Sequence, residues 1–333
     1  MSIEDIVIMK LSENIAYMHY FGMNVMFWKT LHRLNRNNYY LTSKNTQAIE
    51  KYLLNYCITN SFNYLKQNNL KDIQRKNSNI SINNTIWTLW WQGENKAPYI
   101  VKECIKSMRE HANGHQVIVI DQFNYKDYID IPEYILDRYR KGQEDKSKLK
   151  NIVLSKPLLA DIIRCGVLAS YGGIWSDATI FFSKDLDERI FQRKWYTLGQ
   201  DDKTYVGQGK WSTFFFECRN NNSLVKFVFL ALCEYWKKKE YYINYLMFDY
   251  IIDIAYRIDP NIASMINEAP NSKPLTINRS YNEIVTDEKR LDYFIKVQRF
   301  HKLSYKWWID GNTPVENKNG NKTIYGFLKE NYF

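Results

Sequence analysis

The residues best suited to chemistry lie in the segment LLADIIRCGVLASYGGIWSDAT, at positions 158–179. Asp161 and Arg164 stand three positions apart in a run with helical periodicity, so we expect both side chains on one helical face. A carboxylate accepts hydrogen bonds from hydroxyl groups, and a guanidinium offers a planar pair of donors to phosphate. This combination suits a charged, hydroxyl-rich ligand such as a nucleotide diphosphate sugar.

The same segment is predicted to pass from a helix through a turn into a strand. Gly172 and Gly173 end the helical pattern, and they permit a close approach of the backbone to a ligand. A short buried strand, Ile174–Trp175, follows and stops before Asp177. A carboxylate at a strand end is a suitable oxygen ligand for Mg²⁺ or Mn²⁺. The alternative is an aspartate that only caps a turn.

The surroundings of Asp161 and Arg164 decide how this pair is interpreted. A charged pair on a helix is usually a solvent-exposed salt bridge. Here the flanking residues are almost all apolar: Leu158, Leu159, Ala160, Ile162, Ile163, Val167 and Leu168. We therefore expect the pair to be partly buried, where charges need a partner or a ligand.

A strand, a helix and a second strand precede this segment. Ile86–Trp91 is a β-rich run that breaks at Gln92 and Gly93, and a helix is predicted to begin near Pro98. The continuous apolar run Val117–Ile120 is typical of a strand covered on both faces. The pattern predicts a βαβ unit and an α/β fold.

The second half of the chain continues the alternation. Strands are predicted over 195–198 and 214–217. An apolar helix is predicted over 224–236 with Ser223 as its cap, and another over 245–256. Asp249 lies in this last helix, where it is either a structural partner or a group that points at the acceptor.

The composition limits the classes of partner. With 46 Lys and Arg against 36 Asp and Glu, the net charge is +10. A basic chain often binds phosphates of nucleic acids, anionic lipids or nucleotides, although it can also be merely soluble. Because no recognisable DNA- or RNA-binding motif is present, we expect no nucleic-acid partner. The five cysteines form no CxxC pair and are expected to be buried thiols of a cytosolic protein.

Residues 1–80 are predicted to be helical, with a boundary in the stretch 66–84, which is rich in Asn, Lys and Ser. The segment Ile15–Trp28 is too short to span a bilayer. Aromatic and basic residues cluster at its end, so peripheral association with a membrane surface is an alternative. Two further roles remain open for residues 1–80: an acceptor-binding lid and a dimerisation element. The start of the chain has no basic n-region, so we expect a cytoplasmic protein, which could also act at the inner face of the plasma membrane.

The segment 159–179, LADIIRCGVLASYGGIWSDAT, resembles the signature of the capsular polysaccharide synthesis glycosyltransferases. These are related to the DXD-containing sugar transferases of family 32 and, more distantly, to the clostridial glucosylating toxins. The shared pattern is D-x-x-R, Tyr-Gly-Gly, an aromatic residue, one residue, and D-x-D. Segments 86–107 and 300–307 resemble the family's first strand and its His-Lys-Leu element. The resemblance covers about residues 85–310.

The resemblance implies a GT-A fold, which is Rossmann-like and binds nucleotide sugars, with a helical extension at residues 1–80, the transferase domain at 81–310 and a tail at 311–333. It implies transfer of a sugar from a nucleotide sugar, foremost a UDP-sugar, with retention at the anomeric carbon. The acceptor would be a lipid-linked or oligosaccharide precursor of a surface or capsular polysaccharide. The alternative is a degenerate, non-catalytic protein that binds a sugar nucleotide or another anionic ligand.

The resemblance also assigns residues. Arg164 and Asp177 would act in catalysis, and Asp161 would hold ribose or the donor sugar. Asp249 is added to the catalytic set from its place in an apolar helix, as a base or orienting group for the acceptor. The full set expected to bind the donor is Trp87, Gln92, Gly93, Asp161, Arg164, Gly172, Gly173, Trp175, Asp177 and Lys302.

One position departs from the family pattern. Thr179 stands where the family has the second acid of D-x-D, which is its main metal ligand. A hydroxyl is a weaker ligand, so Mn²⁺ or Mg²⁺ would depend on Asp177 with His301, and a neutral imidazole suits Mn²⁺ better. A structural role is the alternative for His301.

If the metal binds weakly, positively charged side chains have to stabilise more of the charge of the leaving group. The diphosphate that leaves during sugar transfer carries negative charge, which has to be stabilised. Arg164, Lys302 and Lys306 could supply that stabilisation.

Overall fold

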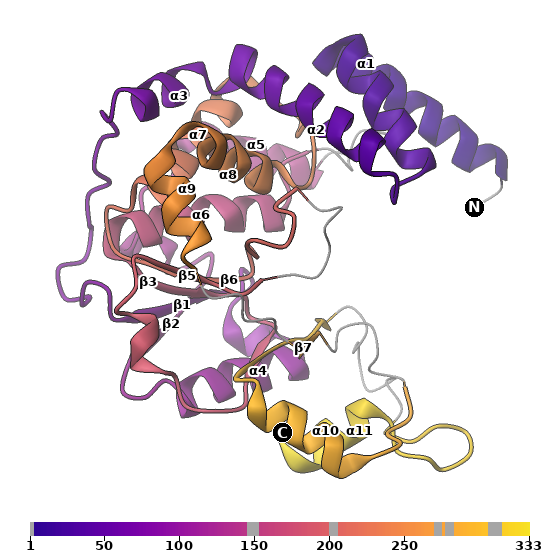
Figure 1. Ribbon diagram of the computed structural model, residues 1–333, viewed down its shortest axis with the longest axis vertical. Coiled ribbons are helices and arrows are strands. Elements are labelled where there is room, and N and C mark those ends of the chain that lie inside the picture. Colours follow the sequence, from indigo (N-terminus) through magenta and orange to yellow (C-terminus); the bar gives the residue numbers. More distant parts are fainter. Residues whose placement is uncertain (1–2, 145–152, 200–205, 270–274, 277–282, 306–314) are drawn as a thin grey trace.

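The computed structural model describes residues 3–144, 153–199, 206–269, 275–276, 283–305 and 315–333. Its centre is a sheet with helices on both faces, which is an α/β fold as predicted (Figure 1). The five strands lie in the order β2-β1-β3-β6-β5. Their bounds are β1 Thr85–Leu89, β2 Gln116–Ile120, β3 Gly173–Ser176, β5 Trp195–Thr197 and β6 Phe215–Cys218.

Strands β1, β2 and β3 are parallel, whereas β6 runs antiparallel to β3, and β5 antiparallel to β6. Ile86 pairs with Ile174, and Trp87 pairs with Trp175. Since successive side chains point to opposite faces, the two isoleucines pack below the sheet with Met108, and the two tryptophans pack above it. The alternation therefore divides the core between the two faces of one sheet.

The helices form two layers around this sheet. Helices α5 to α9 lie on one side in Figure 1, and α4, α10 and α11 lie on the other. Their bounds are α4 Tyr99–Glu110, α5 Glu133–Glu144, α6 Lys156–Tyr171, α7 Ser223–Lys238, α8 Met247–Ile258, α9 Pro260–Asn267, α10 Glu288–Val297 and α11 Ile324–Asn331. Single turns of 3₁₀ helix occur at Glu94–Lys96, Tyr125–Asp127 and Glu188–Ile190.

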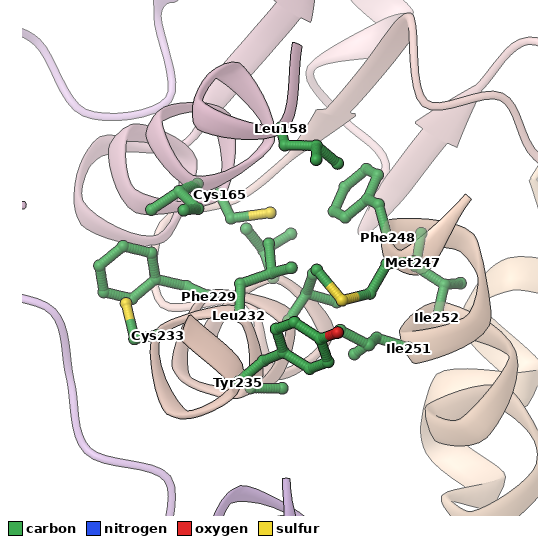
Figure 2. Packing of buried hydrophobic residues seen from close by; sticks show 14 of the residues in the cluster. Leu158, Cys165, Phe229, Leu232, Cys233, Tyr235, Met247, Phe248, Ile251 and Ile252 are labelled. Carbon is green, nitrogen blue, oxygen red and sulfur yellow. The ribbon is translucent and has the colours of Figure 1, made fainter. Parts of the chain in front are cut away.

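Helices α6, α7 and α8 pack closely on one another. Figure 2 shows Cys165 of α6 facing Phe229 and Leu232 of α7, and Phe248 of α8 beside Leu158 of α6. These side chains are buried, and interiors of this kind resist displacement because their packing is dense. The packing fixes where the charged residues of α6 and α8 meet.

A second, smaller sheet lies beside the first. It has the order β4-β8-β7, with β4 at Ile180–Phe182, β7 at Leu275–Thr276 and β8 at Phe300–Lys302. Lys302 pairs with Ile180, and the Leu303 amide donates to the Thr179 carbonyl at 2.9 Å. This pairing brings β8 to the residues that directly follow β3.

The N-terminal region is helical, as its periodicity predicted. It contains α1 Ile3–Leu34, bent at Gly22 (φ 82°), then α2 Tyr39–Tyr52, a π-helical turn Leu53–Cys57 and α3 Thr59–Lys66. Helix α2 packs on α8, and α3 packs on α7. The stretch after α3 is attached to the core as well, because the amides of Lys76 and Asn77 both donate to the Tyr171 hydroxyl.

Strands β1, β2, β3, β5 and β6 and helices α4, α6, α7 and α8 confirm the corresponding sequence predictions. All five cysteines are buried and unpaired, also as predicted. Two expectations were wrong. The cap of α7 is Asn222, not Ser223, and the expected tail contains helix α11, whose Tyr325, Phe327 and Leu328 are buried.

The cap of α7 is directly testable. The Asn222 side chain accepts hydrogen bonds from the amides of Leu224 and Val225, at 3.0 and 3.3 Å. Asn222→Ala removes that acceptor and is expected to lower the free energy of unfolding by about 1 kcal/mol, measured by urea titration. The exposed Ser223 is the control, and Ser223→Ala should change stability by less than about 0.5 kcal/mol. A larger loss in Ser223→Ala than in Asn222→Ala would contradict this assignment.

Candidate functional site

The candidate site lies where the three parallel strands end. Gln92 and Gly93 follow β1, Asp121 follows β2, and Asp177 follows β3. The first two turns are close to each other, since a Cβ at Gly93 would lie 3.7 Å from Asp121 Oδ2. In open α/β sheets, ligands bind outside the carboxyl ends of the strands, so this edge is the natural place for a site.

Asp177 is the centre of the polar network. Its Oδ1 accepts from Arg164 Nη2 and from the Trp175 indole, both at 3.0 Å. Its Oδ2 accepts from Lys302 Nζ at 2.9 Å. One carboxylate thus joins α6, the end of β3 and β8, which are far apart in the sequence.

Arg164 is buried, with 6% of its surface exposed. Its guanidinium carbon lies 4.9 Å from the centre of the Trp175 ring and 5.4 Å from that of Phe248. Nη1 donates to the Thr213 carbonyl and lies 3.4 Å from Asp161 Oδ1. The prediction that the Asp161–Arg164 pair is partly buried is confirmed.

The charges around Asp177 control its ionisation. Burial on its own would raise the pKa of Asp177, but the nearby Lys302 and Arg164 charges, together with the Trp175 and Lys302 hydrogen bonds, lower it below the ordinary value. Asp177 is therefore ionised at neutral pH.

Asp161 behaves in the opposite way. Burial raises the pKa of Asp161 to about 7, Arg164 opposes that rise, and the charges of Asp249 and Asp177 add to it. Near neutral pH, this carboxyl group exchanges between an acceptor form and a form that can also donate. Such a group can bind hydroxyls in either state.

Asp249 lies in the first turn of α8, where a negative charge is favourable. It is 2% exposed and accepts from the Trp211 indole at 3.0 Å. Its charge acts on Asp161, so the two carboxyl groups are neighbours. The structure therefore brings Asp249 close to the site but keeps it buried.

Four other predicted residues lie inside the protein. Trp87 is fully buried, and its indole donates to the Gly172 carbonyl at 3.0 Å. A Cβ at Gly172 would lie 2.0 Å from Asn83 Oδ1, and one at Gly173 would lie 2.3 Å from the Thr85 carbonyl oxygen. The close backbone approach expected at the glycines is thus made by the protein itself. Trp175 is also buried and faces Arg164.

His301 is not brought to Asp177. It lies next to Lys302 on β8, so the two side chains point to opposite faces. Its Nε2 lies 2.8 Å from Ser183 Oγ and 3.0 Å from the Ile295 carbonyl. Burial lowers the pKa of His301 to about 4, although hydrogen bonds to the backbone of Ile295 and Gln298 oppose that shift, so the ring is neutral at pH 7. Lys306 lies outside the described residues.

Sequence reasoning missed several residues that complete the site. Phe248 and Trp211 fix Arg164 and Asp249, and Asp121 lies at the end of β2. Tyr245, just before α8, is also close, since burial and the charges of Asp161 and Asp177 raise its pKa to about 12. Only Asp121 had a sequence signal, because it directly follows a predicted strand.

Comparison with known families supports the resemblance noted in the sequence. The model of the family described as "capsular polysaccharide synthesis protein" matches residues 38–322, which is well over half of the chain. The chain belongs to this family. Among curated proteins, none matches it.

The family match begins earlier than the sequence analysis expected. It starts at residue 38, not near 85, so it includes α2 and α3. These two helices pack on α8 and α7, respectively, and both lie within the matched range. In the described part of the chain, no helix has both the length and the apolar character needed to cross a membrane.

The raised pKa of Asp161 predicts a pH dependence of stability. Because the folded-state pKa of about 7 exceeds the ordinary value of 3.8, the folded state binds more protons between these two values. The contribution is present at low pH and is lost as the pH rises through 7. Between pH 5 and 7, we expect wild-type stability to fall with a steeper slope than that of Asp161→Asn, by at most about 1.4 kcal/mol per pH unit. Parallel slopes in urea titrations would contradict this.

Proposed function

We propose that this protein is a glycosyltransferase of GT-A type. It would transfer a sugar from a nucleotide-sugar donor, foremost a UDP-sugar, to a growing capsular or surface polysaccharide, with retention at the anomeric carbon. The observation that carries the proposal is the Asp177 carboxylate, held by Arg164 and Lys302 at the carboxyl end of the parallel strands. The family match adds capsule biosynthesis as the context.

Exposure separates residues that can touch a ligand from residues that support them. The side chains of Asp177, Lys302 and Asp161 are 28%, 19% and 15% exposed, so a donor can reach them. Arg164 is buried, and Trp175 more so. We assign Lys302 to the diphosphate, and Asp177 and Asp161 to hydroxyls of ribose or the sugar. Arg164 and Trp175 position Asp177.

The carboxyl ends of β1 and β2 are proposed to bind the rest of the donor. Gln92 and Gly93 are partly exposed, and the Gly93 turn lies against Asp121. We assign this pair of turns to the nucleoside. Asp249, which is buried near Asp161, is assigned an electrostatic role: its charge adds to the effect of burial in raising the pKa of Asp161.

The acceptor is proposed to be a lipid-linked or oligosaccharide precursor, bound by a cytoplasmic protein that docks at the inner face of the plasma membrane. The second half of α1 supports this, since Met23, Phe27 and Leu34 recur at helical spacing and are 70%, 51% and 79% exposed. The net charge of +10 favours an anionic surface.

A non-catalytic binding protein is the second candidate, because Thr179 replaces an acid in the motif. Binding alone does not separate the two candidates. Transfer of sugar to an acceptor, or slow hydrolysis of the donor by purified protein, occurs only in the enzyme.

Donor binding is the first test. A nucleotide sugar that binds only the folded protein raises its melting temperature by mass action, by the equivalent of about 2.7 kcal/mol at 100 times Kd. We expect one class among UDP-, GDP- and CDP-sugars to raise Tm by a few degrees. Absence of a shift with every class would contradict the proposal.

Asp177→Asn tests the site within that assay. The amide keeps the size of the side chain but loses the charge, so we expect the donor-dependent shift to disappear and sugar release to fall about 100-fold or more. Asp130→Asn is the matched control, since Asp130 is 83% exposed and lies outside the site. Equal activity of the two variants would contradict the assignment of Asp177.

Membrane docking is tested by flotation with vesicles that contain an anionic phospholipid. Phe27→Glu removes apolar area from the exposed face of α1 and adds a negative charge, so we expect binding to fall about 10-fold. Tyr293→Glu is the control, because Tyr293 is 63% exposed on α10, at the opposite end of the molecule (Figure 1). Equal binding of both variants would contradict docking through α1.

A further inference from the structure

We propose that the ammonium group of Lys302 takes the place of a divalent metal in this site, so that the donor diphosphate binds without one. The inference rests on the proposed function. Mn²⁺ or Mg²⁺ is what the resemblance to DXD transferases implies, and the donor set of the described residues does not fit either ion.

The oxygen atoms that would hold a metal are already engaged. Asp177 Oδ2 and Thr179 Oγ1 both accept from Lys302 Nζ at 2.9 Å, so the ammonium lies between the first and third positions of the motif. Asp177 Oδ1 accepts from Arg164 and Trp175. A divalent ion at the same place would be repelled by the ammonium and would find one carboxylate and one weak hydroxyl ligand.

Among the described residues, no further side chain completes a metal shell with Asp177. The His301 imidazole points to the opposite face of β8, where it contacts Ser183 and the Ile295 carbonyl. Across the residues that the structure describes, no three His, Cys, Asp or Glu side chains form a group that could bind a metal.

Backbone pairing holds Lys302 in this position. Lys302 is the register partner of Ile180, which directly follows the turn at Ala178 and Thr179, and the adjacent Leu303 amide donates to the Thr179 carbonyl. The Lys302 ammonium also lies 5.1 Å from the centre of the Phe214 ring. The pairing of β8 with β4 therefore fixes the backbone of Lys302 beside the motif.

An ammonium has three N–H groups, and two of them serve Asp177 and Thr179. The third can donate to a phosphate oxygen, since the Lys302 side chain is 19% exposed. A charge-assisted hydrogen bond of this kind is among the stronger ones in proteins.

Calorimetric titration of the wild-type protein with UDP, GDP and CDP tests the inference. We expect one nucleotide to bind equally well with EDTA and with Mn²⁺. Lys302→Met should weaken this binding about 10- to 100-fold, and Mn²⁺ should not restore it. Lys302→Arg, which keeps the charge, should retain most of the affinity. The exposed Lys296 of α10 gives the matched control, Lys296→Met, with unchanged binding.

A variant designed to bind Mn²⁺ adds a measurement that does not depend on activity. The double variant Thr179→Asp, Lys302→Met places two carboxylates at the motif and removes the ammonium. Electron paramagnetic resonance with Mn²⁺ alone should detect bound metal in this variant and none in the wild type.

The outcomes separate the two proposals. Loss of wild-type nucleotide binding in EDTA, with recovery on addition of Mn²⁺, would overturn the Lys302 inference and leave the proposed function intact. Failure of every nucleotide to bind under both conditions would overturn the proposed function and this inference with it.

Discussion

The site depends on keeping one partly buried carboxylate ionised. A charge removed from water is costly unless it is paired and hydrogen-bonded, and the Asp177 carboxylate accepts three such contacts, one each from Arg164, Trp175 and Lys302. Each partner comes from a different element, so α6, β3 and β8 must meet for the pairing to exist. The contacts of the fold hold these three elements together at the site. Breaking one partner would leave an opposite charge buried without compensation.

Packing supplies the precision that the charges need. The guanidinium of Arg164 lies against the rings of Trp175 and Phe248, and Phe248 is fixed by the contacts of α8 with α6 (Figure 2). The same helix contributes Asp249, whose charge raises the pKa of Asp161. The pKa values of two aspartates in one network are thus shifted in opposite directions. The nearby cations lower the pKa of Asp177, so it stays charged. Burial and the neighbouring acids raise the pKa of Asp161.

The sequence predicted what depends on local pattern. The helical run around Asp161, the apolar strand at Val117–Ile120 and the βαβ order all follow from short-range periodicity. Contacts made across the fold had no such signal. Phe248 and Trp211 complete the site through tertiary packing. His301 lies on the face of β8 opposite Lys302, and this placement depends on the pairing of β8 with β4, which the sequence does not show. Helix α11 was missed because its apolar residues, Ile324–Leu328, form one short run after a segment rich in Gly and Asn, too short to show a helical period.

The central proposal is that Lys302, held by Asp177 at the carboxyl end of the parallel strands, binds the diphosphate of a nucleotide sugar, while Asp177 binds hydroxyls of the same donor. A crystal structure of the protein with its nucleotide-sugar donor tests this most directly. The account predicts a phosphate oxygen within hydrogen-bonding distance of Lys302 Nζ, with the nucleoside against the turns at Gly93 and Asp121. A donor bound elsewhere on the protein, with the Asp177–Lys302 pair out of contact with it, would contradict the account.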